Sequence, residues 1–152
     1  MMRIFESFEA LQAVVGTEVA VTDWLEITQA RIDRFADATD DHQWIHVDAK
    51  RAAQGPFGRT IAHGFLTLAL LPQWLERSVH VECARMTINY GVNRVRFPAP
   101  VPVGARLRAR LLLHACERPA PDQLHVTWHA QVELEGSPKP ACVAELLLRY
   151  YA

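Results

Sequence analysis

The segment from Gly64 to Leu75 reads GFLTLALLPQWL, and it leaves almost no polar face when it is drawn as a helix. A helix that is apolar on all sides is a buried helix. One helix of about three turns is enclosed on most of its sides only by a curved sheet or by a partner subunit. The segment therefore predicts a long buried helix, Gly64–Leu75, at the centre of the fold.

The residues on either side of this segment predict the layers around it. The second half of the chain alternates apolar runs with clusters of Pro, Gly, Ser and Asp, a pattern typical of antiparallel hairpins. The first half favours short helices that begin after the N-caps Ser7, Thr28 and Asp48. The order predicts an α+β fold in which an antiparallel sheet wraps the central helix. The expected strands are Glu18–Asp23, Val79–Val95, Leu107–Cys116, Leu124–Glu135 and Ala141–Tyr151, and the expected outer helices include Phe8–Val15 and Ala49–Gln54.

The composition predicts one packed domain over residues 1–152. Half of the residues are hydrophobic and 22% are charged, which excludes a disordered chain. The net charge is −1, from 16 Lys and Arg against 17 Asp and Glu. A balance so close to zero argues against a protein that holds nucleic acid or an anionic membrane by bulk charge, and it is compatible with self-association.

The sequence also favours a cytoplasmic protein. The longest apolar run is far shorter than the ~20 residues of a membrane span. The first residues have an acid at Glu6 and lack the apolar stretch of a secretory signal. The three cysteines, Cys83, Cys116 and Cys142, form no Cys-x-x-Cys pair, so we expect buried thiols rather than disulfides or a catalytic nucleophile.

Asp41 and His46 are the first candidates for chemistry. They lie five residues apart, in an expected loop, with Trp44 and Ile45 between them. Apolar neighbours desolvate such groups and move their pKa values toward neutrality, which suits acid–base catalysis near pH 7. The alternative is that Asp41 bonds its own backbone in a turn and that His46 is a hydrogen-bonded structural histidine.

A second candidate site lies at the start of the expected central helix, in Ile61-Ala62-His63-Gly64-Phe65. Backbone N–H groups at a helix N-terminus have no partner within the helix. Gly64 has no side chain, so a carbonyl oxygen can approach these groups as in an oxyanion hole. The alternative is that Gly64 serves packing or turn geometry.

A metal site is the third hypothesis, with His42, His46 and His63 as ligands. The residue after His42 is Gln43, whereas the zinc hydrolase motif His-Glu-x-x-His needs a carboxylate there. We therefore expect no metal. The sequence also lacks the Gly-x-Ser-x-Gly, Gly-x-Gly-x-x-Gly and P-loop motifs, so it gives no sign of serine hydrolysis or of dinucleotide or nucleoside triphosphate binding.

Three motifs together resemble the MaoC-like dehydratase family, in its NodN-like branch and its mycobacterial (3R)-hydroxyacyl-thioester dehydratases. The resemblance runs from about residue 5 to the C-terminus. The motifs are Phe35-Ala36-x-x-Thr39-x-Asp41-x-Gln43-Trp44-Ile45-His46-x-Asp48, then Gly55-Pro56-Phe57-Gly58 with Ile61-Ala62-His63-Gly64-Phe65, and finally Asn89-Tyr90-Gly91-Val92-Asn93-Arg94-Val95-Arg96-Phe97-Pro98-Ala99-Pro100-Val101.

The resemblance implies a hotdog fold, a homodimer whose sheets join edge to edge, and acyl tunnels near the subunit interface. It implies reversible syn addition of water to a trans-2-enoyl thioester, usually of coenzyme A, with no metal or redox cofactor. Asp41 and His46 then hold the water and transfer protons, and the Gly64 N–H binds the thioester oxygen. Further candidates for substrate binding are His63, Thr67, Asn89 and Arg96.

Two departures from the better-known (R)-specific hydratases affect this site. Gln43-Trp44 replaces their Asn-Pro, and Ala69 stands where they have a serine, so that Thr67 offers the nearest hydroxyl. Two other functions stay open: a hotdog acyl-CoA thioesterase, and a non-catalytic subunit that binds acyl thioesters. The presence of both Asp41 and His46 argues against the second, because a binding protein does not need the pair.

Overall fold

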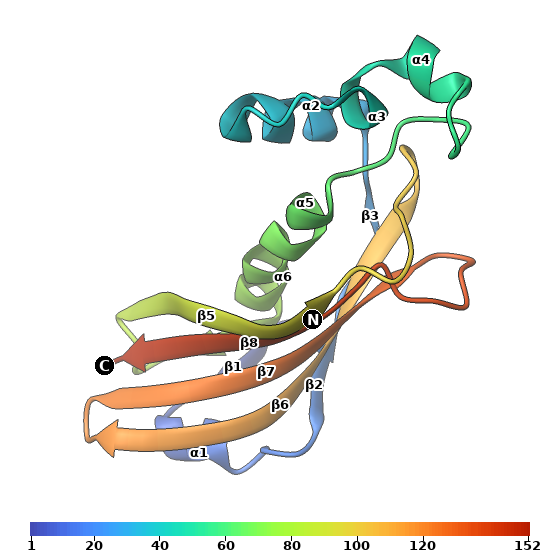
Figure 1. Cartoon of the computed structure of the whole chain (residues 1–152). Coiled ribbons are helices and arrows are strands. Elements are labelled where there is room, and N and C mark those ends of the chain that lie inside the picture. Colours follow the sequence, from blue (N-terminus) through green and yellow to red (C-terminus); the bar gives the residue numbers. More distant parts are fainter.

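The computed structural model describes residues 1–152, and a curved antiparallel sheet wraps around a central helical segment (Figure 1). The sheet has six strands in the order β2-β6-β7-β8-β5, and β3 also pairs with β6. The expected α+β hotdog arrangement is confirmed. Its strands are β2 (Glu18–Val21), β3 (Leu25–Glu26), β5 (Met86–Arg96), β6 (Arg106–Ala120), β7 (Gln123–Leu134) and β8 (Cys142–Tyr151).

Short helices precede the central segment, and the expected N-caps begin three of them. The side chains of Ser7, Thr28 and Asp48 accept hydrogen bonds from the backbone N–H groups three residues later. The first helix ends earlier than expected, and a short helix occupies part of the expected loop around His46. The helices are α1 (Phe8–Gln12), α2 (Gln29–Thr39), α3 (Trp44–Val47) and α4 (Ala49–Ala53).

The central helix is present, but it consists of two pieces. Helix α5 spans Gly64–Ala69 and α6 spans Leu71–Ser78, so the expected single helix is interrupted at Leu70 and continues three residues further than Leu75. Pro72 explains the interruption, because proline has no N–H to donate and is tolerated only in the first turn of a helix. The prediction of one continuous helix over Gly64–Leu75 was wrong in this detail.

The expected strand Val79–Val95 is also two elements. Strand β4 (Val79–Val81) pairs in parallel with β1 (Arg3–Phe5), which the sequence pattern did not predict. A turn follows, and β5 begins at Met86. Strand β5 then pairs with β8 along one side and forms one free edge of the main sheet, with β2 and β3 at the opposite edge.

The core lies between the concave side of the sheet and the helices. One cluster of 30 buried apolar residues includes side chains from both ends of the chain, such as Phe5 and Tyr150, and from α6, such as Trp74. The enclosure is incomplete at α5, because 70% of the Phe65 side chain is exposed. The apolar face of the central helix is therefore covered only in part by this chain.

None of the helices combines the length and the apolar character that crossing a membrane requires.

Candidate functional site

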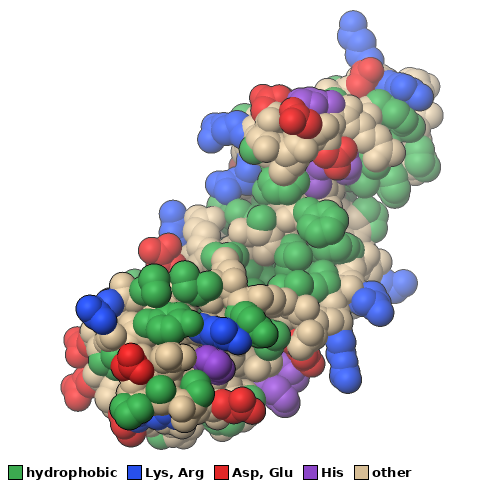
Figure 2. All heavy atoms as spheres, turned by 60° about the vertical axis from the view of Figure 1, so that its left-hand side comes forward, with side chains coloured by type: hydrophobic (Ala, Val, Ile, Leu, Met, Phe, Trp, Pro, Cys, Tyr) green, Lys and Arg blue, Asp and Glu red, His purple; other side chains and the backbone are tan.

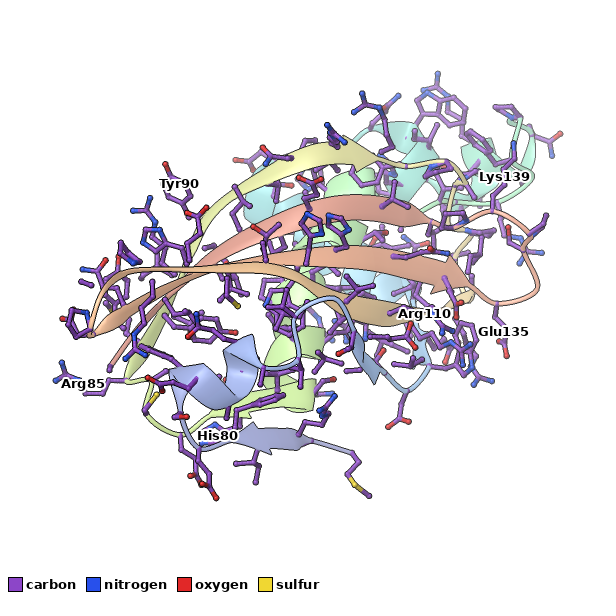
Figure 3. All side chains as sticks on the ribbon, turned by 90° about the horizontal axis from the view of Figure 1, so that it is seen from below. His80, Arg85, Tyr90, Arg110, Glu135 and Lys139 are labelled. Carbon is purple, nitrogen blue, oxygen red and sulfur yellow. The ribbon has the colours of Figure 1, made fainter.

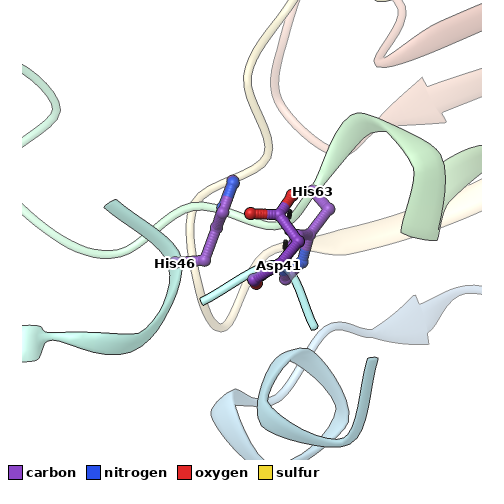
Figure 4. Close-up of side chains that lie close together, drawn as sticks. All are labelled: Asp41, His46 and His63. Atoms are coloured by element: carbon purple, nitrogen blue, oxygen red, sulfur yellow. Dashed lines mark hydrogen bonds and ion pairs between the residues drawn. The ribbon is translucent and has the colours of Figure 1, made fainter. Parts of the chain in front are cut away.

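Asp41, His46 and His63 meet where the α2–α4 segment approaches the start of α5 (Figure 4). Asp41 lies in the loop after α2, His46 lies in α3, and His63 directly precedes α5. One potential ligand atom from each of the three side chains lies within 4.8 Å of the other two. The structure thus brings together the two residues that the sequence singled out for catalysis, and it adds His63 to them.

The imidazole of His46 is fixed in one tautomer by the backbone. Its Nδ1 lies 2.7 Å from the carbonyl oxygen of Ile61. A carbonyl oxygen only accepts hydrogen bonds, so Nδ1 carries the proton and Nε2 keeps a free lone pair. Burial lowers the pKa of His46, and a charge on His63 would lower it further. His46 is 7% exposed, so this free nitrogen belongs to a desolvated base.

The side-chain amide of Gln29 supports the backbone of His46 through hydrogen bonds. The Nε2 of Gln29 donates to the carbonyl oxygen of His46 at 2.8 Å. The hydroxyl of Thr60, which is 1% exposed, donates to Oε1 of Gln29 at 2.6 Å. The sequence analysis missed both residues. The available signal was the position of Gln29 three residues before the buried Ile32, on the apolar face of its helix.

His63 is more deeply buried than His46, with 3% of its surface exposed. The two imidazole rings stack with their centroids 3.8 Å apart and their planes at 22°. The ring of Phe35 lies 4.9 Å away at a steep angle. Nε2 of His63 donates to the backbone carbonyl oxygen of Asp41 at 2.9 Å, whereas its Nδ1 is buried without a partner.

Asp41 differs from the two histidines in its exposure, because 53% of its side chain is accessible. The expected desolvation of the pair by Trp44 and Ile45 was therefore wrong for Asp41. Trp44 instead packs against Gly55. The guanidinium carbon of Arg51 lies over the Trp44 ring, 4.4 Å from the centre of that ring. Asp41 thus faces solvent, and His46 is the buried member of the pair.

Gly64 presents a free donor next to this cluster. Its backbone N–H belongs to the first turn of α5, and no group of the chain accepts a hydrogen bond from it. A Cβ at this position would lie 2.9 Å from the ring of Phe97. The glycine therefore has a packing role as well, because it allows Phe97 to approach the helix closely.

The other candidate residues lie apart from the cluster. Thr67 points into the protein and is 1% exposed. Arg96 lies on the surface and donates to the carbonyl oxygen of its neighbour Val95. Asn89 lines a separate cavity of about 420 Å³, whose walls combine apolar and polar side chains. That cavity is formed by α6, β4, β5 and β8.

The structure does not bring the expected ligand set His42, His46 and His63 together. His42 lies outside the cluster and pairs with Asp37 at 2.8 Å. Asp41, His46 and His63 each offer one ligand atom within 4.8 Å of the others, which is close enough for a common ion. Of these residues, His63 already uses its Nε2 as a donor to the Asp41 carbonyl oxygen.

A family model described as "MaoC like domain" matches residues 10–133. The 3-hydroxyacyl-thioester dehydratase Z of Mycobacterium tuberculosis (strain ATCC 25618 / H37Rv) is 55% identical over 151 residues, which cover 99% of this chain and all of that protein. Nodulation protein N of Rhizobium leguminosarum bv. viciae is 44% identical over 132 residues, 86% of this chain and 82% of that protein.

Among solved structures, the R-hydratase PhaJ1 from Pseudomonas aeruginosa superposes with a TM-score of 0.70 at 25% identity. The match covers 88% of this chain and 79% of the hydratase chain. The similarity therefore extends over both the sheet and the helices that carry the site.

Proposed function

Because the chain belongs to the MaoC-like domain family, we propose that it is a hydro-lyase that interconverts trans-2-enoyl and (3R)-3-hydroxyacyl thioesters. The observation that carries the proposal is the pairing of an accessible carboxylate, Asp41, with a buried imidazole, His46, whose Nε2 is free. A neutral buried imidazole with a free lone pair is suited to act as a general base. The similarity to a named dehydratase over its whole length supports the same reaction.

In the hydration direction, a water molecule lies between Asp41 and His46. Nε2 of His46 removes one proton from the water while the oxygen forms a bond to C3 of the enoyl group. The C2=C3 electron pair moves toward the thioester carbonyl, which becomes enolate-like. The protonated pair then returns a proton to C2 on the same face, which accounts for syn addition. Dehydration is the reverse, and neither direction needs a metal or a redox cofactor.

The negative charge that develops on the thioester oxygen needs a donor. The N–H of Gly64 is unpaired and follows directly after His63, so it is the proposed partner of this oxygen. The proton-transfer pair and this donor come from different segments, which the packing of α3 against the start of α5 brings to one place.

The cavity lined by Asn89 is the proposed chamber for the acyl chain. Its walls include apolar side chains, among them Pro72 and Leu75 of α6, and its size is typical of small-molecule sites. Helices α5 and α6 connect the Gly64 N–H to these walls, which begin at Pro72 in the first turn of α6. Measuring the activity on enoyl-CoA substrates of four to sixteen carbons gives the length of acyl chain that the cavity accepts.

A homodimer is the proposed assembly, and the free edge of β5 supports it. Large apolar side chains along this strand are exposed, including Ile88, Tyr90 and Val92, and Figure 3 shows Tyr90 projecting outward from the sheet. Figure 2 shows hydrophobic side chains gathered across the middle of the visible surface of the molecule, with charged side chains mainly toward its two ends. Long, exposed apolar edges are rare in monomers. We expect light scattering to give a dimer, and Ile88→Lys to give a monomer; a monomeric wild type at micromolar concentration contradicts the proposal.

A cytoplasmic location is also proposed, and the three unpaired cysteines support it. Burial raises the pKa of both Cys116 and Cys142 to about 11, so these thiols are unreactive at neutral pH. The expectation of buried thiols holds for Cys142, whereas Cys83 and Cys116 are only partly buried.

The test of the proposed function is hydration of crotonyl-CoA, followed by the loss of enoyl absorbance, with a thiol reagent present in a parallel reaction. Loss of absorbance without release of free coenzyme A supports the hydratase. Release of free coenzyme A identifies a thioesterase instead. Tight binding of enoyl-CoA without turnover at any chain length identifies a non-catalytic binding subunit.

A further inference from the structure

We propose that His63 is a positioning residue that holds the catalytic carboxylate in place by donating a hydrogen bond to the backbone of Asp41. The proposal rests on the proposed function of Asp41 and His46. It assigns to His63 a role that differs from the substrate binding expected from the sequence.

The first argument is that little else holds Asp41. The hydrogen bond from His63 Nε2 to the Asp41 carbonyl oxygen, at 2.9 Å, is the only one that joins Asp41 to a residue more than two positions away. The contact from the Gln43 N–H to Oδ1 is long, at 3.4 Å, and lies within the same loop. Asp40 leaves the helix with a positive φ of 58°, so the chain turns sharply just before Asp41.

The second argument is that His63 itself is rigid. It is 3% exposed, stacks on His46, and contacts Phe35 at its other side. Its backbone carbonyl oxygen accepts hydrogen bonds from the first turn of α5, at Leu66 and Thr67. Because His63 is held by these contacts, its hydrogen bond ties the loop that carries Asp41 to the start of α5.

The third argument concerns the tautomer of His63. The Asp41 carbonyl oxygen only accepts hydrogen bonds, so the proton of this contact is on Nε2. The other ring nitrogen, Nδ1, is buried and has no partner in the chain. The hydrogen bond to Asp41 is therefore the one hydrogen bond of the His63 ring, and it fixes Nε2 as the donor.

One ring thus touches both members of the catalytic pair. It stacks on the base, His46, and it bonds to the backbone of Asp41, so it sets the distance between them (Figure 4). A shift of about 1 Å between reacting groups costs roughly 100-fold in rate. Loss of this donor is expected to lower kcat with little change in KM, because the groups that bind the rest of the substrate stay in place.

Three variants separate the donor from the ring. His63→Gln and His63→Met have side chains of nearly equal length and both lack the stacked ring, but only Gln keeps an N–H donor. His63→Phe keeps a ring and lacks the donor. We expect Met and Phe to lower kcat by roughly 30- to 100-fold and Gln by less than about tenfold. Equal rates for Gln and Met, or a Phe variant as active as the wild type, overturn the proposal.

Two measurements do not depend on activity. Nitrogen-15 NMR of the histidine side chains in the wild type is expected to show His63 as the neutral Nε2–H tautomer; an Nδ1–H tautomer overturns the proposal without any variant. Amide hydrogen exchange of the peptide that contains Asp40–Gln43 is expected to be faster in the Met variant than in the Gln variant. If the wild type is inactive on every thioester while both results hold, the proposed function fails and the positioning role stands.

Discussion

The protein contains two pairs of stacked histidines, and only one of them has the surroundings of a catalytic site. His46 and His63 stack at 3.8 Å and 22°, and His114 and His129 stack at 3.9 Å and 14°. The first pair is buried at the start of α5. The second lies on β6 and β7, with 41% of the His129 side chain exposed and Glu145 at 3.4 Å.

The two stacks are similar in ring geometry and differ in their hydrogen bonds. In the inner pair, His46 and His63, each ring donates to a backbone carbonyl oxygen, so the tautomers are fixed and Nε2 of His46 is free. In the outer pair, His114 and His129, no such hydrogen bond to a carbonyl oxygen is present. His114 lies at a register shift between Leu113 and Ala115 of β6. Burial together with these carbonyl acceptors distinguishes the site from a surface contact of the same geometry.

The largest expected difference between the pairs is in the rate. His46→Gln and Asp41→Asn are each expected to lower kcat for crotonyl-CoA hydration by about 10²- to 10⁴-fold, since each removes a proton-transfer group. The matched control is His129→Gln, which alters the outer pair and is expected to leave kcat and KM unchanged. Near-normal rates in both inner variants, with normal circular dichroism spectra, would remove the catalytic assignment.

A change in the support of the inner pair is expected to affect stability. Thr60→Val removes the hydroxyl that donates to Gln29 and leaves a buried amide oxygen without its partner. The expected loss is about 1–3 kcal/mol in the free energy of unfolding, measured with urea. Thr60→Ser keeps the hydroxyl and serves as the control. Equal midpoints for Val and Ser would show that this hydrogen bond does not support His46.

The pH dependence is expected to reflect the burial of the inner pair. Burial lowers the pKa of His46 from its ordinary value of 6.5, and only the unprotonated ring accepts the proton of water. As the pH falls, kcat/KM should therefore stay high through pH 6.5 and decline only below it. The pH profile of kcat/KM from pH 4.5 to 8 measures this, and a half-maximal point above 6.5 contradicts it. The His129→Gln profile should superimpose on that of the wild type.

The smallest effect is expected at the outer pair. His114→Gln breaks the exposed stack and leaves the backbone of β6 in place, so the free energy of unfolding should change by less than about 0.5 kcal/mol. Urea unfolding measures this beside Thr60→Val. A loss as large as that of the Thr60 variant would mean that exposed histidine stacking contributes to stability on the scale of a buried hydrogen bond.

Much of the fold was predictable because its signals are local. The apolar run after Gly64 predicted the buried helix, and the Pro and Gly clusters separated the strands correctly. The break at Leu70 was missed because the apolar pattern outweighed Pro72 in the prediction. The parallel pairing of β1 with β4 joins segments more than 70 residues apart, and no local pattern encodes it.

The site was predictable where its residues form a motif. The Asp41 and His46 spacing predicted their meeting, but the roles of Gln29 and Thr60 depend on a contact between residues 31 positions apart. The exposure of Asp41 was not predictable from its neighbours, since Trp44 turns away toward Arg51. Phe65 was expected to be buried with its helix. It is exposed because no other segment of this chain covers that side of α5.

The free edge of β5 also determines how selectively it pairs. The backbone of an edge strand offers the same hydrogen-bond donors and acceptors whatever its sequence. The partner strand and the register of pairing are therefore determined by the side chains and by irregularities such as β-bulges. Arg94 has a positive φ of 51°, and the pairing of β5 with β8 shifts twice, between Asn89 and Gly91 and between Asn93 and Arg96. A regular strand laid along this edge therefore finds matching groups only in the short stretches between these irregularities. The two shifts limit the alignments that are open to any strand that adds there.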